Sequence, residues 1–136
     1  MVRVIMGEKG TGKTKKLIEL INAAAAQESG NIVCIEAKKA MTFDIHYHVR
    51  LIVADDYEIS SYEAMRGFIS GLYAGNYDIS HIFIDNLFKI VKGESNHDAE
   101  MFLDWLERFS AAHGVRFTAA ISVDEDFATE GMRKYL

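Results

Sequence analysis

Short runs of apolar, mostly β-branched residues recur along this chain, and longer stretches with apolar positions at helical spacing separate them. The runs cover residues 2–6, 32–36, 81–85 and 116–122. Runs of this kind, apolar at almost every position, are typical of strands that are buried on both faces of a parallel sheet. The pattern therefore predicts four such strands.

The stretches between the runs predict amphipathic helices. The first covers about residues 12–27 and ends before Gly30. The second begins at Ser60, because Ser60 and Glu63 have the spacing of a capping box. The third begins at a cap formed by Asp98, ends near residue 113, and carries Trp and Phe side chains that are typical of packing on a sheet. A short helical tail is expected after the last strand.

Alternation of buried strands with amphipathic helices predicts an α/β protein, a three-layer α/β/α sandwich with a mostly parallel sheet. Right-handed crossovers then bring the carboxyl ends of all the strands to one edge. The 136 residues show no internal repeat or linker, so residues 1–136 are expected to form a single domain.

Residues 37–60 are the hardest part to interpret. Residues 43–49 alternate between apolar and polar, and residues 50–54 have the pattern of a short strand. A β excursion and an extra edge strand fit this pattern equally well. Asp55 and Asp56, which follow, are typical of a turn.

The loop after the first run carries the clearest chemical motif in the chain. Residues 7–14 read Gly-Glu-Lys-Gly-Thr-Gly-Lys-Thr and fit the pattern G-x-x-x-x-G-K-[ST]. This pattern is a phosphate-binding loop, and it has the required context because a strand is predicted before it and a helix after it.

The residues of this loop predict a nucleotide site. Glycines let phosphate oxygens approach the main chain, and successive backbone N–H groups at a helix N-terminus form an anion cradle. Lys13 is expected to reach the β- and γ-phosphates, and the Thr14 hydroxyl to ligate Mg²⁺. The nucleotide-binding residues predicted here are Gly7, Glu8, Lys9, Gly10, Thr11, Gly12, Lys13, Thr14 and Lys15.

Two of the later strands end in a carboxylate. Asp85 ends the run 81–85, and an acid in that place after a phosphate loop is expected to hold the water shell of Mg²⁺. Glu36 ends the run 32–36, on the ligand-binding edge of an open sheet. A solvated carboxylate paired with Lys38 or Lys39 is the alternative for Glu36.

Composition narrows the function classes further. The net charge is −5 and the pI is about 5.5, which argues against a broad nucleic-acid-binding face. The single cysteine, Cys34, predicts a reduced compartment without disulfides, and the N-terminus does not have the pattern of a signal peptide. A cytoplasmic protein without a membrane anchor is expected. His46 and His48 have the spacing of a metal pair, but no third ligand can be named nearby, so two surface histidines are the favoured interpretation.

The phosphate loop, Asp85 and the order of strands and helices resemble the P-loop NTPases, over most of the chain apart from residues 37–60. Within that superfamily the chain is most similar to the RecA-like ATPases. That resemblance implies that Glu36 polarises the attacking water and that Ser122, after the last strand, senses the γ-phosphate. It also implies that the last strand lies between the phosphate-loop strand and the strand ending at Asp85. In other branches a glutamate follows that aspartate, but here the position is Asn86.

The resulting expectation is Mg²⁺-dependent binding of ATP or another nucleoside triphosphate, with slow hydrolysis. Lys13, Glu36 and Asp85 would be the catalytic residues, and Thr14 and Asp85 would serve the metal. One alternative is a small-molecule or nucleoside kinase, with an acceptor held by residues 37–60 and Asp55 or Asp56 as the base. The other is a non-hydrolysing nucleotide-dependent binding module. No arginine can be assigned from the sequence as an arginine finger that contacts the γ-phosphate. Another copy of the chain or a larger partner is therefore expected to assist hydrolysis.

Overall fold

The computed structural model describes residues 1–7, 10, 12–39 and 44–136. Its elements, in chain order, are β1 (Val2–Met6), α1 (Lys13–Gln27), β2 (Asn31–Glu36), β3 (Arg50–Val53), η1 (Ala54–Tyr57), α2 (Tyr62–Gly75), β4 (Ile79–Asp85), α3 (Leu87–Ile90), α4 (Asn96–His113), β5 (Arg116–Ile121), η2 (Glu125–Phe127) and α5 (Glu130–Arg133).

The described residues form one sheet of five strands in the order β1-β5-β4-β2-β3. Every neighbouring pair is parallel, so the carboxyl ends of all five strands meet at one edge. The four predicted strands are confirmed. The last strand, β5, lies between β1 and β4, as the sequence resemblance implied.

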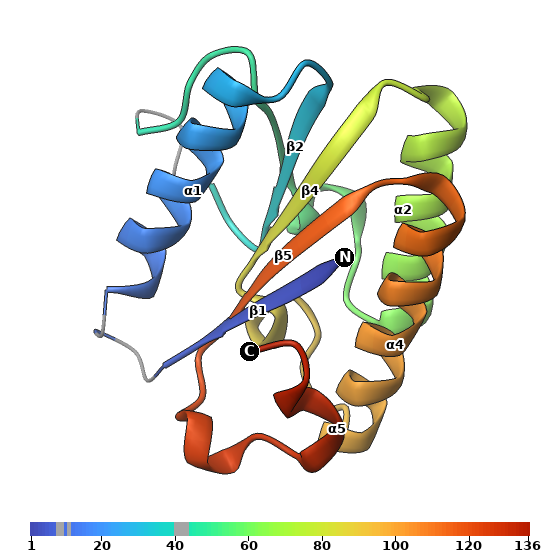
Figure 1. The fold of residues 1–136 in the computed structure, drawn as a ribbon. Helices are drawn as coiled ribbons and strands as arrows, with labels where there is room; N and C mark the ends of the chain where they lie inside the picture. Colours follow the sequence, from blue (N-terminus) through green and yellow to red (C-terminus); the bar gives the residue numbers. More distant parts are fainter. Residues whose placement is uncertain (8–9, 11, 40–43) are drawn as a thin grey trace.

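Helices cover both faces of the sheet, as expected for an α/β protein in three layers (Figure 1). Helix α1 packs on one face, where Leu17 and Ile21 meet Cys34 and Phe83 of the strands. Helices α2 and α4 pack on the other face, and their side chains form the larger of the two apolar clusters.

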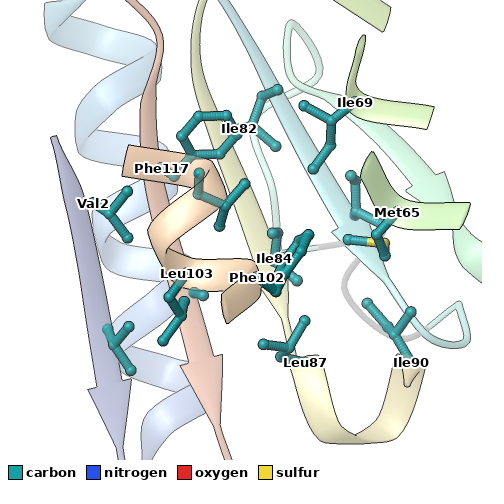
Figure 2. Close-up of a cluster of buried hydrophobic side chains, with 14 of the residues drawn as sticks. Val2, Met65, Ile69, Ile82, Ile84, Leu87, Ile90, Phe102, Leu103 and Phe117 are labelled. Atoms are coloured by element: carbon teal, nitrogen blue, oxygen red, sulfur yellow. The ribbon is translucent and has the colours of Figure 1, made fainter. Parts of the chain in front are cut away.

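The larger cluster joins residues that are far apart in the sequence. Figure 2 shows Met65 and Ile69 of α2 and Phe102 and Leu103 of α4 directed toward the strand side chains, among them Ile84. All five are fully buried. Because burial of one such side chain stabilises a protein by roughly 1.5–3 kcal/mol, this layer fixes the sheet that carries the loop ends.

Two helix starts differ from the sequence prediction by a few residues. Helix α2 is capped by Ser61, whose Oγ accepts from the Ala64 N–H at 3.0 Å, and not by Ser60. Helix α4 is capped by Ser95, with Asp98 as the third residue of a reciprocal capping box. Ser61 and Ser95 prevail because each hydroxyl reaches the N–H three residues later.

Residues 50–53 form the extra edge strand that was one of the two alternatives for this part of the chain. Strand β3 pairs in parallel with β2, so that Ile52 lies beside Ile35 and Val53 beside Glu36. Residues 44–49 form turns and not a strand, and residues 40–43 lie outside the described part. The main-chain N–H of Asp55 donates to the carbonyl of Ala37 at 3.3 Å, which holds η1 beside the end of β2.

The outer edge of β1 is covered by the C-terminal half of the chain. The Val4 N–H donates to the carbonyl of Tyr135 at 2.7 Å, and the Val2 N–H donates to Oε2 of Glu107 at 3.1 Å. These hydrogen bonds pair main-chain N–H groups of the edge strand that could otherwise bind a strand of another chain. The tail after β5 thus closes the edge of the sheet.

Cys34 is a buried free cysteine in β2, and its desolvation raises the pKa of the thiol. Among the helices of the part of the chain that the structure describes, none has the length and apolar character needed to cross a membrane.

A polar network ties the end of α1 to the sheet, at the edge opposite to the phosphate loop. Glu28 accepts hydrogen bonds from Nδ1 of His81 at 3.0 Å and from Arg116 at 2.6 Å. Nε2 of His81 lies 2.8 Å from Oγ1 of Thr118. Because the Glu28 carboxylate can only accept, Nδ1 of His81 carries the proton and Nε2 accepts from Thr118.

This network predicts that the protein loses stability as the pH falls. Burial lowers the pKa of His81 below its ordinary value of 6.5, although the hydrogen bond to Glu28 opposes the shift. For Glu28, burial raises the pKa, but hydrogen bonds from His81, Arg116 and Ser80 outweigh it and leave the pKa lowered. Both groups therefore bind protons more readily in the unfolded chain, so the stability present above pH 6.5 is lost progressively below it.

Urea unfolding at a series of pH values from neutral to acidic would test this expectation. The free energy of unfolding should begin to fall below about pH 6.5 as the unfolded histidine takes up its proton. In His81→Gln, an amide can keep both hydrogen bonds but does not titrate, so the first part of that fall should disappear. An unchanged slope in this variant would show that His81 does not control the pH dependence.

Candidate functional site

A cavity of about 420 Å³ opens at the carboxyl edge of the sheet, within the roughly 300–1,000 Å³ usual for ligand pockets. The loop after β1 and the start of α1 form one side of it, and the residues after β4 and β5 form the other. Its lining residues are Gly10, Gly12, Lys13, Thr14, Asp85, Asn86, Lys89 and Ser122. The parallel strand order brings these segments together although they are far apart in sequence.

The loop glycines have backbone conformations that other residues rarely adopt. Gly10 has φ 90° and Gly12 has φ 83°, both in the left-handed region. A Cβ atom at either position would meet no neighbour within 4 Å. The backbone angle, and not a lack of space, therefore explains why glycine stands at these two places.

Helix α1 begins without the side-chain cap that the other longer helices have. Gly12 is its N-cap and has no side chain to form a cap, and the first turn of the helix has no acidic residue. Helices α2 and α4 are capped by Ser61 and Ser95. The positive end of the α1 dipole thus lies beside three lysines of the first turn, Lys13, Lys15 and Lys16.

Charged groups from three elements face one another across the cavity. Burial lowers the pKa of Lys13, while Asp85 raises it and Lys89 lowers it. Burial and the nearby Glu36 raise the pKa of Asp85, against the opposite effects of Lys89 and Lys13. Desolvation thus disfavours the charged form of both groups. A phosphate beside Lys13 would favour the charged lysine, and a cation beside Asp85 would favour the charged aspartate.

Glu36 lies directly beside Asp85, because β2 and β4 are neighbours and the two residues are register partners. Its side chain is buried, with a relative exposure of 1%, which contradicts the alternative of a solvated surface carboxylate. Glu36 lines a second cavity of about 380 Å³ that also touches Asp85 and Asn86. It therefore lies next to the phosphate-loop cavity and not inside it.

Ser122 is held by Asn86, the residue after the β4 carboxylate. The Ser122 N–H donates to Oδ1 of Asn86 at 3.3 Å, and Nδ2 of Asn86 donates to the Ser122 hydroxyl. Asn86 is itself buried. These bonds fix the orientation of both side chains at the point where β4 and β5 end, so the departure from a glutamate at position 86 has a structural role.

Four of the nine predicted loop residues line this cavity: Gly10, Gly12, Lys13 and Thr14. Glu8, Lys9 and Thr11 lie outside the described residues. Gly7 and Lys15 are described but do not contribute to the lining of the cavity, and Lys15 is exposed.

The sequence interpretation did not identify Lys89 as a site residue. Lys89 lies in α3 and lines both cavities. Helix α3 has only four residues, so no helical period marks it in the sequence. The one usable signal was a lysine placed four positions after Asp85.

Three arginines in the second half of the chain, Arg108, Arg116 and Arg133, do not line the cavity. Arg116 is bound to Glu28 at the opposite edge of the sheet, and Arg108 lines a surface cavity between α2 and α4. Arg133 is in α5. Within the described residues, the phosphate-loop cavity is thus lined by two lysines and by no arginine.

His46 and His48 are not part of a metal centre in the described part of the chain. His46 and His48 lie in a turn, with ring centroids 5.1 Å apart. No group of three or more His, Cys, Asp or Glu side chains is placed there to hold a metal ion.

Another cavity, of about 440 Å³, lies at the opposite edge of the sheet beside His81, Glu28 and Arg116. It has no glycine loop and no helix N-terminus in its lining. In open parallel sheets, ligands bind outside the carboxyl ends of the strands. The cavity beside the phosphate loop is therefore the better candidate.

Comparison of the chain with models of known protein families gave no match, and comparison with curated proteins gave none either.

Proposed function

We propose that this chain is a small RecA-like P-loop protein that binds Mg²⁺ and ATP, or another nucleoside triphosphate, and hydrolyses it slowly. One observation carries the proposal. The uncapped N-terminus of α1, with Lys13 and Thr14, shares a single cavity with Asp85 of β4. These are the parts needed to hold a polyphosphate and its cation.

Different residues of the cavity bind the phosphates and the cation. The N–H groups at the start of α1 and the Lys13 ammonium bind the phosphates, where a negative charge also offsets the helix dipole. The Thr14 hydroxyl and the Asp85 carboxylate are oxygen donors, the type that Mg²⁺ prefers. Mg²⁺ supplies charge neutralisation between the phosphate oxygens.

Glu36 is the proposed base. It lies beside Asp85 at the neighbouring strand end, and as a carboxylate it can orient a water and accept its proton. Asn86 cannot take this role, because an amide does not accept a proton and its side chain is engaged with Ser122. Ser122 lines the cavity at the remaining strand end and is proposed to contact the γ-phosphate.

Turnover is expected to be slow. An arginine supplied in trans can raise such a rate by on the order of 10³ or more, and the described lining of the cavity contains none. We therefore propose that a second copy of the chain or a larger protein partner accelerates hydrolysis.

Release of phosphate from ATP, measured with Mg²⁺ and with EDTA, tests this function. Hydrolysis should require Mg²⁺. In Asp85→Asn, the Mg²⁺ concentration for half-maximal rate should rise about 10- to 100-fold, the range seen when groups that support a metal site are removed. Asp56→Asn is a matched control, because Asp56 is exposed on η1 and lines neither cavity. Equal effects of both substitutions, or hydrolysis in EDTA, would contradict the assignment of Asp85.

A further inference from the structure

The second cavity at the carboxyl edge, about 380 Å³, adjoins the phosphate-loop cavity, and the two share the lining residues Asp85, Asn86 and Lys89. It is far larger than the volume of one water molecule, about 30 Å³ in the liquid. A site that only positions a water for hydrolysis does not need such a space. The cavity can therefore hold a small organic molecule beside the γ-phosphate position.

The extra strand β3 does not line this cavity itself but leads into η1, whose Asp55 does. β3 pairs with β2, and the Asp55 N–H bonds to the carbonyl of Ala37, so that η1 stands next to the end of β2. Asp55 and Lys38 consequently line the cavity together with Glu36. The segment after β2 thus builds a site and does more than connect two strands.

Charge is distributed unevenly in this cavity. Two carboxylates, Glu36 and Asp85, lie at the strand ends; Glu36 is buried and Asp85 is half-buried. At its exposed rim lie two lysines that do not line the phosphate-loop cavity, Lys38 and Lys92, together with the single carboxylate of Asp55. A ligand that matches this pattern has an anionic group for the lysines and a hydroxyl group for the buried carboxylates.

We propose that this cavity binds a phosphoryl acceptor, a small alcohol that carries a carboxylate or phosphate group. The inference rests on the proposed function, because ATP in the neighbouring cavity is the phosphoryl donor. Lys38 and Lys92 bind the anionic group of the acceptor. Its hydroxyl group is directed toward Glu36 and occupies the position that the attacking water takes during slow hydrolysis.

The transfer step balances without a further reactant. The acceptor oxygen forms a bond to the γ-phosphorus while the bond from the γ-phosphorus to the bridging oxygen breaks. The bridging oxygen leaves with the electron pair as part of ADP. The hydroxyl proton goes to the Glu36 carboxylate, so the products are ADP and a phosphate ester.

The test uses the full chain with Mg²⁺ and ATP, and three probes: D-glycerate, glycerol 3-phosphate and, as the neutral control, glycerol. With a charged alcohol, ADP should form at least about tenfold faster than with no addition, because a bound hydroxyl group is held in position for attack. ³¹P NMR should show a new phosphate ester, and glycerol should give neither effect. A response to glycerate alone or to glycerol 3-phosphate alone would identify the carboxylate or the phosphate as the recognised group.

A pair of lysine variants tests the position of the acceptor. Lys38→Gln should raise the KM for the charged alcohol about tenfold, as loss of one charge-assisted contact would, with kcat little changed. Lys39→Gln is the control, because Lys39 is the exposed neighbour and does not line the cavity. Equal effects of the two substitutions would overturn the assignment of Lys38.

The outcomes separate this inference from the proposed function. Mg²⁺-dependent phosphate release that neither charged alcohol accelerates would overturn the acceptor site and leave the hydrolase. Acceleration by glycerol equal to that by the charged alcohols would overturn the role of the lysines. Failure to bind or hydrolyse ATP in the absence of any alcohol would overturn the proposed function itself.

Discussion

Lys13→Ala is expected to weaken ATP binding about ten- to hundredfold and to leave adenosine binding unchanged. The Lys13 ammonium lines the phosphate-loop cavity, so it meets the phosphates and not the nucleoside. Hydrogen bonds to charged groups contribute roughly 1.5–3 kcal/mol, and 1.4 kcal/mol corresponds to a factor of ten. Calorimetric titration with both ligands measures the two effects.

Lys16→Ala is the matched control for this experiment. Lys16 is exposed, lies in the same first turn of α1, and does not line the cavity. It should weaken ATP by much less than Lys13→Ala. An equal loss of ATP and adenosine in Lys13→Ala would show that the substitution damages the protein and that Lys13 is not a phosphate ligand.

The second large effect is expected from Glu36→Gln, which should lower the rate of ATP hydrolysis by roughly 10² or more, the scale on which positioned bases act. Glutamine has nearly the same shape, so it fits a position with 1% exposure, but it cannot accept the proton. Affinity for Mg·ATP should be retained, because Glu36 lies outside the phosphate-loop cavity. Single-turnover kinetics and a binding titration separate the two quantities.

Two comparisons make this result interpretable. Glu19→Gln, an exposed carboxylate on α1, should leave the rate unchanged. An unchanged melting temperature in Glu36→Gln would exclude loss of folded protein as the cause. If the rate is the same in Glu36→Gln and in the natural sequence, Glu36 is a structural carboxylate and the RecA-like mechanism loses its base.

The sequence predicted the strands well, because burial of a strand on both faces depends on local properties of the sequence. A continuous apolar run such as 81–85 can only be buried, and a parallel sheet buries it on both faces. Gly10 and Gly12 mark positive φ angles directly, since few other residues adopt them. Parallel strands then placed Asp85 and Ser122 at the same edge as the loop.

The rest depends on contacts that no local pattern carries. Ser60 and Ser61 are the same residue type, so the sequence does not distinguish them as caps. Ser61 caps α2 because its hydroxyl accepts a hydrogen bond from the Ala64 N–H. The bonds between Asn86 and Ser122 join residues from two strand ends. Asp55 lines a cavity with Glu36 because β3 pairs with β2, and the sequence left that pairing open.

The most direct test of the central proposal is a ¹⁵N NMR titration of the full chain with Mg²⁺ and a non-hydrolysable ATP analogue. The account predicts that the largest shifts fall on the amides of Gly10, Gly12, Lys13 and Thr14, followed by Asn86 and Ser122, which line the same cavity. Amides near His81 and Arg116, beside the cavity at the opposite edge, should move little. Shifts concentrated at that opposite edge, or no shifts at millimolar nucleotide, would contradict the proposal that the phosphate loop binds a nucleotide.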